Sequence, residues 1–278
     1  MSISTELDPL DGALAPERVY YAVGALLGVE DFSAEQTYHR GRLARALSFL
    51  EGPGTVSGLE VKYVGPQGPD EQIIVRAGIA IDRLGRIIEV PRDACIRLDK
   101  WYKAQDHSEL VQGFHNAAGG VIVDVFIRFI SCDRALTPAF ATGPFDATDY
   151  VSPSRTRDGY KAELVIRKEG TPGLPIDPWP DLAAEADPAK RRTALHQAIF
   201  DSYGSRVFKR ENGDGKLVPL PEHADGQDPT SVFLARFVIP ADAGDPPTRK
   251  AVKIEPDNDK RTFVYSGGAL GRWIGIQP

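Results

Sequence analysis

The sequence predicts an α+β protein, mainly antiparallel β and sandwich- or barrel-like, with one buried N-terminal helix and a second helix near 188–203. Short runs rich in Val, Ile and Phe recur along the chain, as is typical of strands. Glycine and proline, 27 and 22 of the 278 residues, separate these runs as turn formers. Two further segments carry apolar residues at helical spacing, which accounts for the two helices.

The pattern divides the chain into three parts. Residues 1–30 are expected to form an N-terminal arm, because polar residues precede YYAVGALLG, an apolar piece too short to fold alone. Residues 31–170 are expected to hold a helix plus a β-domain. Residues 171–278 are expected to form a loop-rich extension, with the second helix and C-terminal strands that complete or flank the β-domain.

The first helix is predicted to run from residue 33 to about residue 50. Ser33 and Gln36 fit a capping box, in which each side chain satisfies a backbone N–H at the helix start. Gly52-Pro53-Gly54 is expected to end the helix. Its apolar stripe consists of Leu43, Leu47 and Leu50. We expect this stripe to be buried and to anchor the helix on the first strands.

The strands are predicted from segments rich in β-branched and aromatic residues. They are TVSGLEVKYV, IIVRAGIAID, RIIEVP, ACIRLDKWY, VIVDVFIRFI, KAELVIRKE, SVFLARFVIP, AVKIEP and RTFVYS. Gly58 indicates a bulge or a close backbone approach. Asp82-Arg83-Leu84-Gly85-Arg86 is predicted to be a tight hairpin turn. In VIVDVFIRFI, the polar Asp124 and Arg128 indicate a half-buried strand, and residues 131–160 are predicted to be a loop.

The second helix has a clear start. Asp187 is suited to cap it, and Pro188 fits its first position, where no N–H is needed. Leu195, Ile199 and Tyr203 are expected to line one of its faces.

Composition and charge bound the class of protein. Hydrophobic residues make up 42% and charged residues 26%, which is enough for a normal core. The net charge of −6 argues against a general nucleic-acid binder, which needs a basic face. No segment resembles a signal peptide or reaches the length of a membrane span. A protein made in the cytoplasm, with no membrane insertion, is therefore expected.

The two cysteines give little support for a metal site. Cys95 and Cys132 share no CxxC spacing and have no neighbouring histidine. We expect two buried or half-buried thiols in strands. Whether they pair with each other stays open.

The first helix carries an acid, a base and a guanidinium. Glu35, His39 and Arg42 lie along one side of it, so acid–base chemistry is one interpretation. The segment lacks HExxH, and no second His or carboxylate recurs at metal spacing. GxSxG, P-loop and GxGxxG motifs do not occur, and the five histidines lie in unrelated contexts. Packing or partner contact is favoured, so no catalytic, cofactor-binding or metal residue is predicted.

Two acidic turns and three tryptophans leave alternatives open. Glu211-Asn212-Gly213-Asp214-Gly215 and Asp257-Asn258-Asp259 place oxygen ligands at short spacing, as Ca²⁺ requires. Neither completes an EF-hand, and turn chemistry explains both. Trp101, Trp179 and Trp273 are expected in core or interface, with a sugar-stacking surface as the alternative.

Several motifs together resemble a family of structural proteins encoded with contractile phage tails and phage-like (extracellular contractile) injection systems. The resemblance rests on DFSAEQTYHRGRLARALSFLEGPGTVSGLEV and VRAGIAIDRLGRIIEVP, and later on SRTRDGYKAELVI, VFLARFVI and DNDKRTFVYS. It covers most of residues 24–270. Family members often carry a longer, Trp- or Cys-bearing segment where this chain has EGPGTVSGLEV, and residues 171–230 look specific to this chain.

The resemblance implies a non-enzymatic structural or adaptor protein of a virion or extracellular particle, at the baseplate or at tail-fibre attachment. Expected partners are other tail or baseplate proteins and further copies of the chain, with no nucleic acid. The arm, residues 131–160 and residues 171–230 are the expected contact regions. One alternative is a receptor- or glycan-binding tail protein. The other is an envelope-degrading hydrolase, which would need a carboxylate pair in a cleft.

Overall fold

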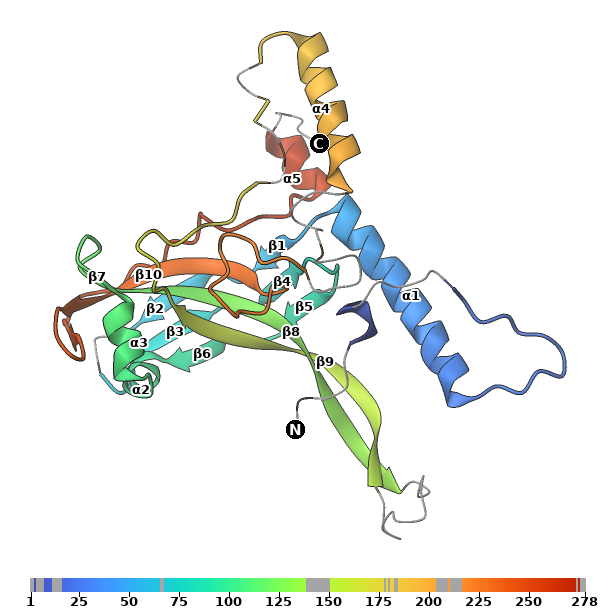
Figure 1. Ribbon diagram of the computed structural model, residues 1–278, viewed down its shortest axis with the longest axis horizontal. Coiled ribbons are helices and arrows are strands. Elements are labelled where there is room, and N and C mark those ends of the chain that lie inside the picture. Colours follow the sequence, from blue (N-terminus) through green and yellow to red (C-terminus); the bar gives the residue numbers. More distant parts are fainter. Residues whose placement is uncertain are drawn as a thin grey trace.

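Three antiparallel sheets build the body of the protein, and helices and a long hairpin project from it (Figure 1). The computed structural model describes residues 3, 8–11, 17–65, 68–138, 151–177, 179, 181–182, 185–203, 210, 217–273 and 275. All pairs of named strands in this part of the chain are antiparallel. The predicted α+β class, mainly antiparallel β, is confirmed.

Two of the sheets are small and come from the first hundred residues. One has the order β1-β4-β5, from Gly54–Gly58, Gly78–Ile81 and Ile87–Val90. The other has the order β2-β3-β6, from Val61–Val64, Gln72–Val75 and Ala94–Arg97. Segment IIVRAGIAID thus forms two strands in different sheets, since Arg76 and Ala77 lie between β3 and β4.

The third sheet is built around the long strand β8. Its order is β11-β10-β8-β7, from Thr248–Arg249, Val232–Asp242, Gly120–Pro138 and Phe114–His115. Strand β9, Val151–Ile166, also pairs with β8 and forms a hairpin with it. The predicted loop over 131–160 is therefore wrong for its described residues; residues 139–150 lie outside them.

The helices occupy the ends and flanks of this body. They are the 3₁₀ turn Pro9–Asp11, α1 at Val29–Leu50, α2 at Leu98–Lys103, α3 at His107–Gln112, α4 at Pro188–Ser202 and α5 at Gly267–Trp273. The second predicted helix is confirmed as α4. Segment ACIRLDKWY is part strand and part helix, β6 and α2. Helix α5 was not predicted, and 251–256 and 261–266 form no named strand.

One hydrophobic core joins all three sheets. It contains alternate side chains of β8 and β10 together with inward residues of the small sheets, among them Val61, Ile73, Val75, Ile88, Val123, Val125, Ile127, Leu234, Phe237 and Ile239. Spacing by two residues in these strands places one face of each on this core.

Asp124 departs from its predicted place on a half-buried strand, because it is completely buried. Arg236, directly opposite it on β10, donates to it at 2.6 and 2.8 Å, and Arg167 donates to it at 2.5 Å. Two guanidinium groups therefore compensate one buried carboxylate, which would be costly to bury alone.

Helix α1 packs on the body with a different face from the predicted one. Leu43 and Leu50 are 58% and 81% exposed, whereas Ala44 and Ser48 are each 5% exposed. The expected burial of the leucine stripe is therefore wrong, apart from the half-buried Leu47. A close approach explains the reversal: a Cβ placed on Gly85 would lie 1.7 Å from the carbonyl oxygen of Ala44. Only small side chains fit at that distance.

The ends of α1 also differ from the prediction in part. The helix begins at Val29, four residues before Ser33, with Gly28 as its N-cap residue. The Asp31 carboxylate accepts a hydrogen bond from the Gly28 backbone N–H at 2.8 Å, which replaces the predicted Ser33–Gln36 capping box. The predicted end is confirmed, since the helix stops at Leu50 just before Gly52.

Candidate interaction surfaces

Three parts of the described chain extend beyond the β body in Figure 1. Helix α1 and the segment before it lie on one side, α4 and α5 are both toward one end, and the far half of the β8–β9 hairpin points away at the other. Each carries exposed apolar residues, including Leu26, Leu50, Phe200, Trp273 and Leu136. Apolar side chains gathered on projecting elements are typical of surfaces that other proteins cover.

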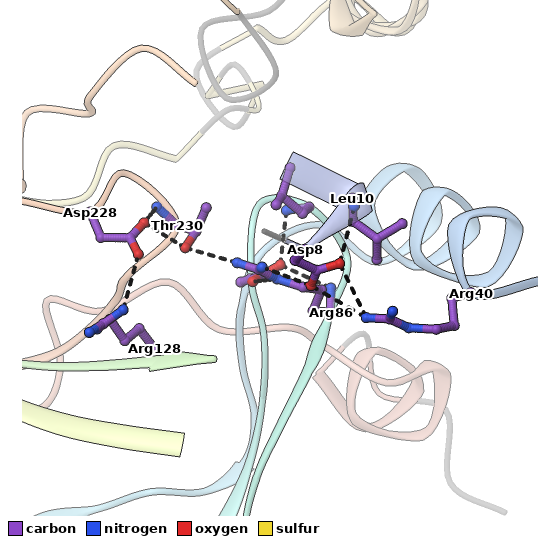
Figure 2. Close-up of polar contacts among 9 residues, drawn as sticks. Asp8, Leu10, Arg40, Arg86, Arg128, Asp228 and Thr230 are labelled. Atoms are coloured by element: carbon purple, nitrogen blue, oxygen red, sulfur yellow. Dashed lines mark hydrogen bonds and ion pairs between the residues drawn. The ribbon is translucent and has the colours of Figure 1, made fainter. Parts of the chain in front are cut away.

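A polar network attaches the arm and α1 to the β4–β5 turn (Figure 2). Asp8 accepts hydrogen bonds from Arg86 at 3.2 Å and from Arg40 of α1 at 3.3 Å. Arg86 also donates to Asp82 at 2.7 Å and to the Thr230 hydroxyl at 3.0 Å. The buried Arg86 guanidinium therefore connects three segments that are far apart in the sequence, and Asp8 adds α1 as a fourth.

The carboxylate of Asp82 shapes the turn itself. It accepts the backbone N–H groups of Leu84 and Arg86, both at 2.9 Å. Burial raises the pKa of Asp82, while the Arg86 guanidinium and these N–H groups act in the opposite direction. The predicted hairpin turn is confirmed, with Gly85 at a φ of 84°.

Helix α4 lies on the surface along its whole length. Asp187 caps it as predicted, accepting from the Ala189 N–H at 2.8 Å. None of its described side chains is buried, and Phe200 is 74% exposed. It meets α1 through Tyr203, whose ring stacks on Phe49 at 5.8 Å and whose hydroxyl accepts from Arg45 at 3.1 Å. The predicted face with Leu195 and Ile199 exists but is exposed.

The far half of the hairpin is a two-stranded ribbon. Residues 134–138 of β8 and 153–158 of β9 are exposed. Cys132, at the base of this ribbon, is buried as predicted, whereas Cys95 is exposed on β6, an edge strand of its sheet. Both thiols are free.

The acid–base candidates of α1 lie on the helix surface. Glu35 and His39 approach to 3.9 Å along the helix surface, with the His39 side chain 72% exposed. Arg42 is exposed and makes no ion pair within the described part of the chain. This open helix surface differs from the clefts in which catalytic groups are usually found.

The acidic turn at Asp257-Asn258-Asp259 is occupied by backbone partners. Asp257 accepts from the Asp259 N–H at 3.0 Å, and the Asn258 amide bonds both the N–H and the carbonyl of Val61, at 2.8 and 3.0 Å. The turn at 211–215 lies outside the described residues. Within them, no three His, Cys, Asp or Glu side chains come together as metal ligands would.

The three tryptophans lie on separate elements. Trp101 of α2 packs against the core, Trp179 follows β9 in an irregular segment, and Trp273 ends α5. Trp273 is 78% exposed and stacks on Tyr265 at 6.2 Å. The rings therefore divide between core and surface, and Tyr265–Trp273 is the exposed pair.

One pocket of about 520 Å³ brings carboxylates together, between α3 and the end of β9. Glu109, Glu169 and Asp225 line it, with Lys168 and Gln105. Lys168 donates to Glu109 at 2.5 Å, and Arg167 bonds both oxygens of Glu169 at 3.0 and 3.1 Å. Burial acts most strongly and would raise the pKa of Glu169, but the hydrogen bonds and charge of Arg167, together with backbone N–H groups, outweigh it and lower the pKa. A general acid needs the opposite shift.

Comparison with protein-family models and with curated proteins found no match to this chain. Within the described residues, no helix combines the length and apolar character of a membrane span.

Sequence reasoning missed the network around Asp8 and Arg86, since nothing in the residues indicates that they meet. It also missed the inward face of α1, although a pattern of small residues in the sequence marks that face. Small residues recur at Thr37, Gly41, Ala44 and Ser48, spaced by four, three and four. That spacing defines one helix face, and its small side chains allow a close approach.

Proposed function

We propose that the chain is a non-enzymatic structural or adaptor component of a contractile phage tail or phage-like injection particle, at the baseplate or at tail-fibre attachment. Its partners are the neighbouring proteins of that particle. The observation that carries the proposal is α4, a helix of 15 residues without one buried side chain.

A helix of this length is marginal in water when nothing packs on it. Most helical stability in proteins comes from burying an apolar face. Ile199, Phe200 and Tyr203 form such a face, and among the described residues Phe49 and Arg45 contact Tyr203. Docking onto a neighbouring subunit would supply the missing contacts.

The remaining parts of the surface fit the same role. The arm and the hairpin ribbon, like α4 and α5, extend from a well-packed core and present mixed charges with scattered apolar residues. Such surfaces serve recognition by shape, whereas in the carboxylate pocket Glu109 and Glu169 are ion-paired and the pKa of Glu169 is lowered. The balance favours assembly over catalysis.

The experiment is to tag the chain in its host, purify contractile particles and locate the tag by electron microscopy. The proposal expects the chain in the particle fraction, with density at the baseplate or at the fibre attachment. A chain that stays outside intact particles, or a purified chain that cleaves peptidoglycan or capsule, would contradict it.

Glycan binding by a tail protein is the second candidate, and one observation favours it. Tyr265 and Trp273 form an exposed stacked pair, and exposed aromatic rings are a usual platform for sugars. A glycan array with the native chain and with Trp273→Ala distinguishes the two. Binding that is lost with Trp273 would support the receptor role.

A further inference from the structure

Helix α1 carries a continuous exposed stripe on the side that faces away from the β4–β5 turn. We call it the outer stripe; its members are Val29, Phe32, Gln36, His39, Leu43, Ala46 and Leu50, all exposed. They follow one another at alternating steps of three and four residues. A stripe with this spacing is the seam by which one helix packs along another.

The residues of the outer stripe are not the ones that hold α1 against the body. The inward face, with Ala44 and Ser48 buried, already holds α1 against the body at the close approach to Gly85. The large apolar side chains Val29, Phe32, Leu43 and Leu50 point elsewhere and remain exposed. Over 22 residues the stripe is about 33 Å long, enough for a stable helix pair.

The charges of α1 are divided along its length. Its first half carries Glu30, Asp31 and Glu35, and its second half carries Arg40, Arg42 and Arg45. Two such helices side by side in parallel would bring like charges together. If the two helices are antiparallel, the acidic half of each lies against the basic half of the other. Their helix dipoles then point in opposite directions, which is also favourable.

Of the three arginines of α1, Arg42 makes no ion pair with the part of the chain that the structure describes. Arg40 bonds Asp8, and Arg45 lies over the rings of Phe49 and Tyr203. Arg42 follows Glu35 by seven residues, so both border the same side of the outer stripe. In an antiparallel pair, residues at this flanking position of one helix meet the same position of the other.

We infer that two copies of this chain pair through their α1 helices, antiparallel and about a twofold axis between Gln36 and His39. Alternating layers then place Phe32 of one copy against Leu43 of the other and Val29 against Ala46. Gln36 meets His39 in the central layer, and Glu35 of each copy pairs with Arg42 of the other. A contact of this kind is self-complementary, as a twofold dimer requires.

The first test measures the mass of the purified full chain by sedimentation over a concentration series. Twice the 30.3 kDa of one chain is expected at high concentration. Leu43→Asp is expected to raise the dimer dissociation constant by at least about tenfold, with an unchanged circular dichroism spectrum, because Leu43 is exposed in the single chain. Ala34→Asp is the control, because Ala34 is exposed and lies on a side of the helix away from the seam. A chain that stays monomeric at every concentration would overturn the inference.

Charge reversal tests the register. Glu35→Arg and Arg42→Glu should each weaken the dimer, and the double variant should restore it, because the pair is rebuilt with its charges exchanged. Additive weakening in the double variant would show that the two residues do not meet.

Disulfide trapping tests the direction, in a Cys95→Ser background that removes the exposed thiol. Val29→Cys combined with Ala46→Cys should give a covalent dimer on oxidation, whereas Val29→Cys alone should not. Within one helix these positions are about 26 Å apart, so an intrachain bond is excluded. A covalent dimer from Val29→Cys alone would indicate parallel helices and overturn the inference. The inference does not rest on the proposed function, since these tests use the purified chain only.

Discussion

The α carbon of Gly85 faces the backbone of Ala44 so closely that a Cβ there would lie 1.7 Å from the Ala44 carbonyl oxygen. This contact joins the β4–β5 turn to the middle of α1. It sets which side of the helix is inward, and therefore which side chains the protein presents to its surroundings. The orientation of α1 follows from backbone proximity and not from the largest apolar residues.

Gly85→Ala should lower the free energy of unfolding by at least about 2 kcal/mol. The new methyl group overlaps the helix backbone, and the left-handed φ of 84° costs an alanine about 1–2 kcal/mol by itself. Urea denaturation followed by circular dichroism measures the change. Gly24→Ala is the matched control, with a φ of 87° and nothing near its Cβ. Equal losses in the two variants would mean that the close approach contributes nothing.

Ala44→Leu should destabilise the monomer, whereas Leu43→Ala should hardly change its stability. If the leucine stripe were buried, Leu43→Ala would be the damaging change. Leucine at the buried position 44 overfills the space and should cost about 1–3 kcal/mol. Alanine at the exposed position 43 should change monomer stability by less than about 0.5 kcal/mol. Thermal unfolding of dilute, monomeric samples compares them. A larger loss from Leu43→Ala would restore the leucine face as the buried one.

Asp124→Ala should destabilise the fold by about 3–5 kcal/mol, because it leaves Arg167 buried and Arg236 mostly buried without their shared carboxylate. Glu163→Ala is the control: it removes a partly exposed carboxylate from Arg128 and should cost less than about 1 kcal/mol. Denaturant titration of both variants gives the difference. Similar small losses would mean that the buried network is dispensable.

Stability should fall as the pH drops from 7 towards 5, through His223. Burial lowers the pKa of His223 more than its bond to the Ser231 carbonyl raises it, and the Arg83 cation acts with burial. Its Nδ1 accepts the Leu220 N–H at 3.0 Å, which requires the neutral ring. Below about pH 6.5 the unfolded chain therefore binds a proton at His223 that the folded chain does not bind, which favours the unfolded state.

The resulting slope is at most about 1.4 kcal/mol per pH unit for this one group. His223→Gln should remove its share of the pH dependence, measured by urea unfolding at several pH values. The same slope in both proteins would show that His223 is not the group responsible.

The sequence predicted well what depends on local chemistry. Asp187 and Pro188 mark the start of α4, Gly52 follows the end of α1, and Gly85 marks a hairpin turn. Each of these signals acts over a few residues, within a turn or a helix end. The β-rich class follows in the same way from short apolar runs between glycines and prolines.

The failures share one cause, which is that burial depends on distant partners. Leu43 and Leu50 have the spacing of a core stripe. They are nevertheless exposed, because Gly85 lies against the backbone of Ala44 and so sets another face of α1 inward. Asp124 looks like a surface residue until Arg167 and Arg236 enclose it. The ribbon beyond Cys132 has the sequence character of a loop, because its charged and polar residues are mixed with proline and few apolar residues, yet β8 and β9 pair through their backbones there.

The sequence predicts the projecting parts of the protein only approximately. The arm, 131–160 and 171–230 were expected as contact regions, and parts of each do project. Helix α1 was expected to be buried, so the outer stripe was not anticipated. A pattern of apolar residues alone does not tell whether they pack within the chain or on a second one.

The most direct test of the central claim, that α4 docks on other particle proteins, is the incorporation of a charged variant. Ile199→Asp combined with Phe200→Asp should leave the isolated chain folded, since both residues are exposed and α4 adds nothing to the core. This variant should be absent from purified particles, while Gln197→Asp, on the same helix, should be incorporated normally. Incorporation of the double variant at the level of the native chain would contradict the account.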